Sequence, residues 1–135
     1  MSNETLKILI VDDDSNFART LGSILQVEGY SCDVAYSAEQ ALDFFHQEQY
    51  DLILTDVKMS GMNGAQLHRQ IKALKPDLPV VLMTAYASEH SIENSLQRGA
   101  LSALIKPLDI PKLLLFLNSL AKGTELAIIG NHRYN

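Results

Sequence analysis

The stretch LKILIVDDD, residues 6–14, joins a continuous apolar run to three consecutive aspartates. A short run of Leu, Ile and Val is typical of a strand that is buried on both faces of a sheet. A second run, DLILTD at residues 51–56, also ends on an aspartate. Two such runs predict buried parallel strands whose acidic residues meet at one edge of the sheet.

Strand-like runs alternate with helical patterns along the rest of the chain. Ser37 followed by Gln40 is typical of a capping box, whereas the helix that contains Ile92 and Leu96 has the least regular pattern. The β–α units, joined by right-handed crossovers, predict an α/β fold with a doubly wound five-stranded parallel sheet of flavodoxin-like order 2-1-3-4-5. The strands are expected over 6–11, 31–35, 51–55, 79–83 and 101–105, with helix starts at Asp14 or Ser15, at Ser37, after the turn 60–64 and at Asp109.

Size and charge limit the classes of function. The 135 residues suit one domain, expected over 1–122, with 123–135 as a C-terminal tail or the start of a linker. The net charge of −5 and the scattered basic residues argue against direct binding of nucleic acid. The sequence has no apolar stretch long enough to cross a membrane and no signal-peptide pattern at its start, so a cytoplasmic location is expected.

Polar residues follow the apolar runs where each predicted strand ends. Asp12 and Asp13 follow the first strand, Asp56 the third, Thr84 the fourth and Lys106 the fifth. In an open α/β sheet, the functional site lies beyond the carboxyl ends of the strands, near the point where the strand order reverses. We therefore expect the three carboxylates to converge.

Three converging carboxylates cannot all stay ionised without a cation. Two unit charges about 4 Å apart repel by roughly 4 kcal/mol at an effective dielectric constant of about 20. Either one carboxyl group is protonated or a metal ion binds, since Lys106 supplies a single positive charge. Oxygen ligands with room for water favour Mg²⁺ over Zn²⁺. The alternative is that residues 12–14 form only a helix cap and an exposed loop, although a cap needs one aspartate.

Five motifs stand out along the chain: ILIVDDD at 8–14, LTDVKM at 54–59, GMNG at 61–64, MTA at 83–85 and KP at 106–107. Together they resemble the receiver domain of two-component response regulators over residues 6–122. The resemblance implies a CheY-like fold and a signalling domain that accepts a phosphoryl group, rather than an enzyme. Each motif is weak alone, and their order and spacing make the resemblance specific.

The resemblance implies a role for each acidic residue. Asp56 would become a 4-aspartylphosphate, with the phosphohistidine of a sensor histidine kinase or a phosphotransfer protein as the donor. Asp13, Asp56 and the backbone carbonyl of Lys58 would ligate Mg²⁺, and Asp12 would bind it through water. Lys106 and Thr84 would contact phosphoryl oxygens. Phosphorylation and dephosphorylation would both be catalysed by the domain itself, the latter with a water in line with the phosphorus.

Three positions depart from the family pattern, and one of them, Leu108 in place of the frequent Phe, is expected to change packing only. Ser60 stands where receivers usually carry Pro, and the turn is expected to form because Gly61 and Gly64 are flexible. Ala103 stands where an aromatic residue usually rotates on activation. Either the output does not use that movement, or Tyr86 or Leu104 takes its place.

The last helix suggests an interaction surface. Leu113 and Leu117 are expected on its core face, Leu115 almost opposite and Phe116 at the flank. Exposed apolar residues here predict a homodimer through the helix around Ile92, the strand 101–105 and this last helix, although an isolated surface leucine is also common.

Three other functions are alternatives to that of a receiver domain. A phosphatase of the haloacid-dehalogenase type would use Asp12 as the nucleophile and Asp14 as the general acid, but it leaves Asp56 unexplained. A flavin or nucleotide module would need a phosphate-binding loop where the three aspartates repel phosphate. A receiver-like scaffold that is never phosphorylated would not need the full acidic set. The histidines at 46, 68, 90 and 132 share no metal-ligand spacing and are expected on surfaces or helix faces.

Overall fold

The computed structural model describes residues 6–85, 96–97, 99–122 and 133–134. The strands predicted from the sequence are present, with bounds that shift by about one residue. The fourth helix was predicted around Ile92 and Leu96, and most of it lies outside the described residues. The elements are β1 Lys7–Val11, α1 Ser15–Val27, β2 Ser31–Ala35, α2 Ala38–Gln47, β3 Leu52–Asp56, α3 Gly64–Leu74, β4 Val80–Thr84, β5 Ser102–Ile105, α5 Ile110–Lys122 and β6 Arg133–Tyr134.

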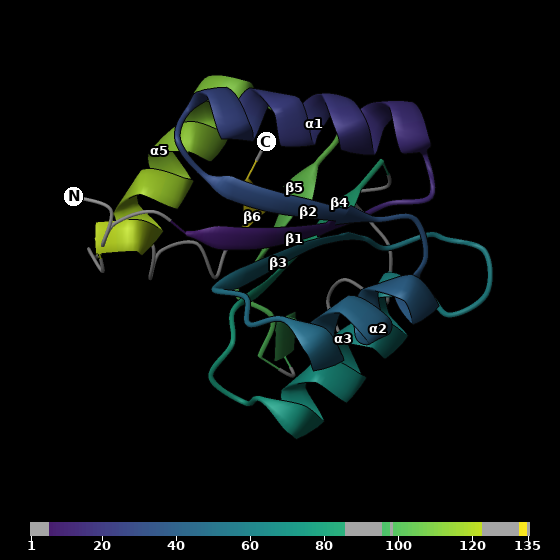
Figure 1. Ribbon diagram of the computed structural model, residues 1–135. Coiled ribbons are helices and arrows are strands. Elements are labelled where there is room, and N and C mark those ends of the chain that lie inside the picture. The colour runs from purple at the N-terminus through teal and green to yellow at the C-terminus, as the bar shows by residue number, and fades with distance from the viewer. Residues whose placement is uncertain (1–5, 86–95, 98, 123–132, 135) are drawn as a thin grey trace.

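The strands form one sheet in the order β2-β1-β3-β4-β5-β6, and every pairing is parallel. The predicted order 2-1-3-4-5 is confirmed. The sixth strand was not predicted, because the two residues of β6 are too few to carry an alternating pattern. It pairs with β5 at the edge of the sheet (Figure 1). Within the described part of the chain, no helix is long and apolar enough to cross a bilayer.

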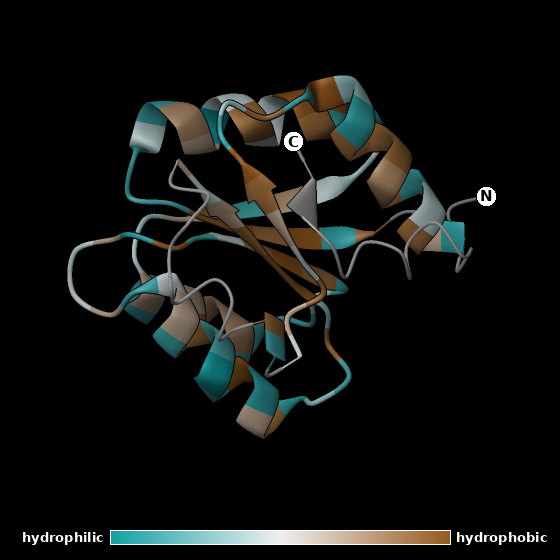
Figure 2. Cartoon of the chain, turned by 180° about the vertical axis from the view of Figure 1, so that it is seen from behind, coloured by the Kyte–Doolittle hydropathy of each residue, from teal (hydrophilic) through white to brown (hydrophobic). Residues whose placement is uncertain are grey.

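Helices cover both faces of the sheet. Figure 1 shows α1 and α5 on one face and α2 and α3 on the other. Successive side chains of a strand point to opposite faces, so Ile8 and Ile10 pack with α1 and α5, whereas Leu9 and Val11 pack with α2 and α3. The apolar strands between the two helical layers are the brown ribbons in the middle of Figure 2. Burial on both faces explains why the strand sequences are continuously apolar.

Polar side chains fix the starts of the helices near the carboxyl edge of the sheet. Asp14 caps α1, because its Oδ1 accepts a hydrogen bond from the Phe17 amide at 3.1 Å. Ser37 caps α2 through the Gln40 amide at 3.0 Å. The predicted capping box is only half correct, since the Gln40 side chain accepts from the amide of Tyr36 instead of Ser37. The Gln40 side chain therefore satisfies the Tyr36 amide, and α2 still begins directly after the cap Ser37.

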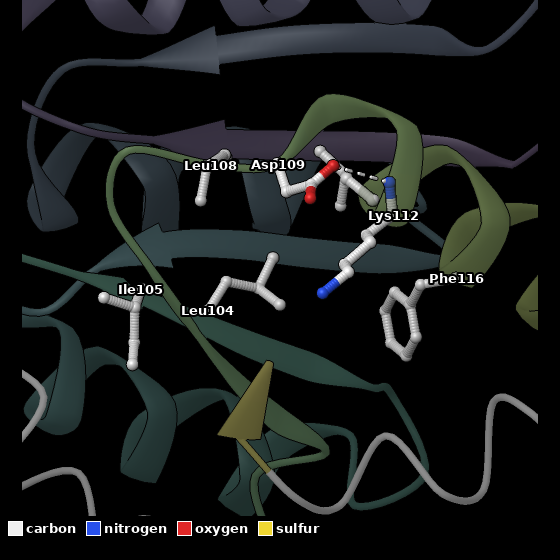
Figure 3. Close-up of a pocket in the computed structure, with 7 residues that line it drawn as sticks. Leu104, Ile105, Leu108, Asp109, Lys112 and Phe116 are labelled. Atoms are coloured by element: carbon white, nitrogen blue, oxygen red, sulfur yellow. Dashed lines mark hydrogen bonds between the residues drawn. The ribbon is translucent and has the colours of Figure 1, made fainter. Parts of the chain in front are cut away.

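The exposed face of α5 differs from the prediction. Leu115 is 61% exposed, as expected, but Phe116 is only 3% exposed and lies in the core. Phe116 follows Leu113 by three residues, so both lie on the same side of the helix. Figure 3 shows Phe116 and Leu104 lining one pocket between α5 and β5, near the Asp109 side chain that caps the helix. The exposed apolar surface is therefore narrower than the sequence suggested.

One histidine lies on a helix face, as expected, but that face is buried. His68 on α3 is 1% exposed, and neither ring nitrogen has a hydrogen-bond partner among the described residues. It follows Leu67 on a helix whose buried face also includes Ile71, so this face is wider than the apolar pattern indicates. Burial is the main cause that lowers the pKa of His68 to about 4. His46 is exposed as expected, and His90 and His132 lie outside the described residues.

Candidate functional site

Three carboxylates lie together at the carboxyl edge of the sheet. Asp12 and Asp13 directly follow β1, and Asp56 ends β3. The two strands are neighbours in register, with Val11 opposite Thr55, so the chain brings residues 12 and 56 to the same level. One carboxylate oxygen from each aspartate lies within 4.8 Å of the others. The sequence placed these groups correctly because parallel strands end at the same edge.

Lys106 joins the cluster from the end of β5. Its ammonium group donates a hydrogen bond to Asp12 Oδ2 at 2.7 Å and lies 3.3 Å from Asp56 Oδ1. It also sits 4.3 Å above the centre of the Phe17 ring. Burial alone would lower the pKa of Lys106, but its hydrogen bond with Asp12 and the charges of Asp12 and Asp56 raise it. The lysine therefore stays charged and neutralises part of the acidic cluster.

The charge at Asp56 is only partly compensated. Burial, followed by the charge of Asp12, raises the pKa of Asp56 to about 6, although Lys106 opposes the shift. One ammonium group is thus not enough to balance three carboxylates, as the sequence suggested. A set of close carboxylate oxygens whose negative charge is not fully neutralised suits a hard divalent cation such as Mg²⁺.

The loop between β3 and α3 closes over this edge. The Ser60 amide donates to Asp13 Oδ2 at 3.1 Å, and Gly61 adopts a positive φ of 75°. Gly64 needs no such freedom, contrary to the expectation of flexibility there. A Cβ on Gly64 would overlap the backbone of Asp56, so glycine is required for space.

Thr84 and Lys58 lie at the same edge. Thr84 ends β4, is 2% exposed and accepts the Lys106 amide through its backbone oxygen at 2.7 Å. Asp56 pairs with Met83, so Thr84 lies one residue beyond the level of Asp56. Lys58 is in the exposed loop two residues after Asp56.

Three contributors were missed by the sequence reasoning: the Ser60 amide, the Phe17 ring and the spatial role of Gly64. A backbone amide leaves no signal in the sequence, because every residue except proline has one. Phe17 was visible only as a core residue of its helix. Its position three residues after the cap Asp14 was the available clue, because the first turn of α1 faces the site.

A doubly wound sheet with this acidic cluster and lysine at its carboxyl edge defines a CheY-like domain. The family model for the response regulator receiver domain matches residues 8–118. The chain belongs to this family. The prediction of a receiver domain of two-component response regulators is therefore confirmed.

Two similar proteins support this membership. The chain is 42% identical over 113 residues to the transcriptional regulatory protein ZraR of Escherichia coli (strain K12), covering 84% of this chain and 26% of that protein. It is 38% identical over 113 residues to sporulation initiation phosphotransferase F of Bacillus subtilis (strain 168), covering 84% of this chain and 90% of that protein. The chain thus spans about a quarter of the transcriptional regulators that it matches and most of the smaller protein.

Solved structures agree with the fold. The response regulator TrrA from Thermotoga maritima, in complex with Mg(2+)-BeF, is 33% identical with a TM-score of 0.77, covering 84% of this chain and 97% of that one. A two-component response regulator from Clostridium difficile is 33% identical with a TM-score of 0.81, covering 86% and 95%.

The haloacid-dehalogenase alternative is not supported. Asp14, its proposed general acid, caps α1 through the Phe17 amide, and the family match is with receivers.

Proposed function

We propose that this receiver domain is a Mg²⁺-dependent switch in which Asp56 accepts a phosphoryl group from the phosphohistidine of a sensor histidine kinase or a phosphotransfer protein. The observation that carries the proposal is the convergence of Asp12, Asp13 and Asp56 with Lys106 at the carboxyl edge of the sheet. Phosphoryl transfer mainly requires alignment and neutralisation of charge. This cluster has the groups for both.

The donors suit Mg²⁺. Asp13, Asp56 and the Lys58 carbonyl would hold the ion directly, and Asp12 would hold it through water. When bound, Mg²⁺ supplies positive charge that neutralises the carboxylates and the phosphoryl oxygens. The Mg(2+)-BeF complex of the Thermotoga maritima relative supports this proposal by analogy.

The chain's own residues then carry the transfer. An Asp56 carboxylate oxygen attacks phosphorus, the phosphorus–nitrogen bond of the donor breaks, and the imidazole nitrogen keeps the electron pair. With its pKa near 6, Asp56 is mostly ionised at neutral pH. Lys106 remains protonated and pairs with a phosphoryl oxygen. Dephosphorylation, which the domain catalyses itself, uses a water that attacks phosphorus opposite Asp56 and releases inorganic phosphate.

The new charge drives the switch. A phosphoryl group adds about −1.5 to −2 charges at neutral pH, next to Thr84 at the end of β4. Contact with Thr84 favours a second state of this edge, which changes the affinity for an output partner or domain. The unit that switches would be residues 1–122, with 123–135 as a tail or the start of a linker, although its residues 133–134 pair with β5 as strand β6.

The output surface includes α5. Leu115 is exposed there and suits a homodimer through α5, β5 and the helix around Ile92, most of which lies outside the described residues. Ala103 is 1% exposed and has no ring to rotate, and the alternative Leu104 is also buried in the core. Tyr86, the other alternative, lies outside the described residues.

Intact-mass measurement after incubation with acetyl phosphate and Mg²⁺ tests the proposal. The wild type should gain the mass of one phosphoryl group, and Asp56→Asn should gain none. Asp14→Asn serves as the control and should be labelled like the wild type, because Asp14 only caps α1. Equal labelling of Asp56→Asn and the wild type would overturn the assignment of the acceptor.

A further inference from the structure

The loop between β3 and α3 contributes a hydrogen bond to the one exposed carboxylate of the cluster. Asp12 and Asp56 are 1% and 8% exposed, whereas the Asp13 side chain is exposed. Lys106 and the Asp14 amide both donate to Asp12. The Ser60 amide donates a hydrogen bond to Asp13 Oδ2 at 3.1 Å.

Without this hydrogen bond, electrostatic repulsion would favour rotation of the Asp13 side chain away from Asp12 and Asp56. Its carboxylate oxygen lies within 4.8 Å of oxygens from two other acidic side chains, and like charges at such distances repel. An exposed side chain can relieve the repulsion by rotating into solvent. A hydrogen bond to an ionised acceptor is stronger than one between neutral groups, and it opposes this rotation.

The donor itself is held in place by the loop. At the end of the loop, the Gly64 amide donates to the Val57 carbonyl at 2.9 Å. Asn63 and Gln66 form a complete capping box at the start of α3. Close to Ser60, the Met62 amide lies 3.4 Å from Glu39 Oε2 of α2. Ser60 thus presents its amide from a loop that is tied to β3, α3 and α2.

We propose that the Ser60 backbone amide is a positioning group of the cation site, which keeps the Asp13 carboxylate beside Asp12 and Asp56 before a cation binds. A carboxylate has lone pairs for several partners, so Asp13 can accept from Ser60 and ligate a cation together. The inference rests on the proposed function, in which this cluster binds Mg²⁺. Proline at position 60 would remove the donor.

Mg²⁺ affinity of three proteins tests the inference: the wild type, Ser60→Pro, which lacks the amide proton, and Ser60→Ala, which keeps it. Titrations followed by amide NMR shifts give the dissociation constants. Loss of a hydrogen bond that orients a metal ligand typically weakens binding at least tenfold, so we expect roughly tenfold weaker binding for Ser60→Pro. Ser60→Ala should bind like the wild type. Equal affinities of Ser60→Pro and Ser60→Ala would overturn the inference.

Amide hydrogen exchange without metal gives a second readout that does not depend on the folding of the proline variant. The Ser60 amide should exchange several-fold faster in Asp13→Ala than in the wild type, because it loses its acceptor. Equal exchange in the two proteins would overturn the inference. If the wild type itself fails to bind Mg²⁺, the proposed function fails, and the exchange comparison still decides whether Ser60 holds Asp13.

Discussion

Gly64 lies so close to the backbone carbonyl of Asp56 that a Cβ atom would overlap it. The start of α3 and the end of β3 therefore pack backbone to backbone. This contact holds together the two ends of the loop that carries Lys58 and Ser60. The position of Asp56, the proposed phosphoryl acceptor, therefore depends on the position of the start of α3.

We expect Gly64→Ala to destabilise the domain by about 3 kcal/mol or more, because the overlap with Asp56 involves rigid backbone. Urea unfolding gives the free energy. Gly22→Ala is the matched control, since its Cβ would meet a side-chain methyl of Val34 at 3.3 Å. The control should change stability by less than about 1 kcal/mol. Similar losses in both variants would contradict the role of the close approach.

His68 should make the domain sensitive to acid. Its folded pKa of about 4 lies below the ordinary value of 6.5, so the fold favours the neutral ring. The stabilisation is complete above about pH 6.5 and is lost as the pH falls toward 4, which amounts to about 2 kcal/mol at pH 5. His68→Leu should remove this loss, and at pH 7 it should stabilise by about 1 kcal/mol because no ring nitrogen is left unsatisfied.

Urea unfolding of wild type and His68→Leu at pH 5 and 7 measures the effect as the difference between the two proteins. His46→Gln changes an exposed histidine on α2 and should follow the wild type at both pH values. A pH-independent difference between His68→Leu and the wild type would contradict the prediction.

The Phe17 ring should help to hold Lys106 in place. Cation–π contacts stabilise by about 1 kcal/mol, so Phe17→Leu should slow phosphoryl uptake from acetyl phosphate several-fold. Phe17→Tyr keeps the ring and should react at nearly the wild-type rate. Equal rates for the Leu and Tyr variants would show that the ring contact at Lys106 does not matter for uptake.

Asp56→Asn should stabilise the metal-free domain at pH 7 by about 1–2 kcal/mol, since it removes a buried charge whose pKa is raised to about 6. The gain should shrink as the pH falls from about 6 to about 4, where the wild-type carboxyl group is protonated. Mg²⁺ should narrow the difference at pH 7 by stabilising the wild type through binding. Urea unfolding in EDTA and in Mg²⁺ checks both effects, with the exposed Asp43→Asn as the unaffected control.

Leu115→Glu tests the homodimer without harm to the core. Leu115 is 61% exposed, so stability should change by less than about 0.5 kcal/mol. Phe116→Lys should instead cost about 3–5 kcal/mol, because Phe116 is buried. Light scattering with a phosphoryl mimic should show dimers of the wild type and monomers of Leu115→Glu. Dimers of both, or monomers of both, would count against the proposed dimer surface.

Most of the fold and much of the candidate site could be predicted from the sequence. The strand residues 8–11 and 52–54 are apolar because both faces of the sheet are covered, and the aspartates follow them directly. The buried faces of the helices were harder to predict. Phe116 and His68 lie at the borders of the apolar stripes, where tertiary packing decides which side chains are buried. The Ser60 contact could not be predicted from residue type, because the donor is a backbone amide. The pair in β6 was too short for any periodic signal.

The bond between Asp12 and Lys106 links residues 94 positions apart. During synthesis the first strand and its aspartates emerge long before the lysine at the end of β5. A chain truncated before β5 would keep all three carboxylates and lack the ammonium group that partly neutralises them. In the proposed function, such a chain would lack the lysine that pairs with the phosphoryl oxygen, so phosphoryl transfer would require the fifth strand in the sheet.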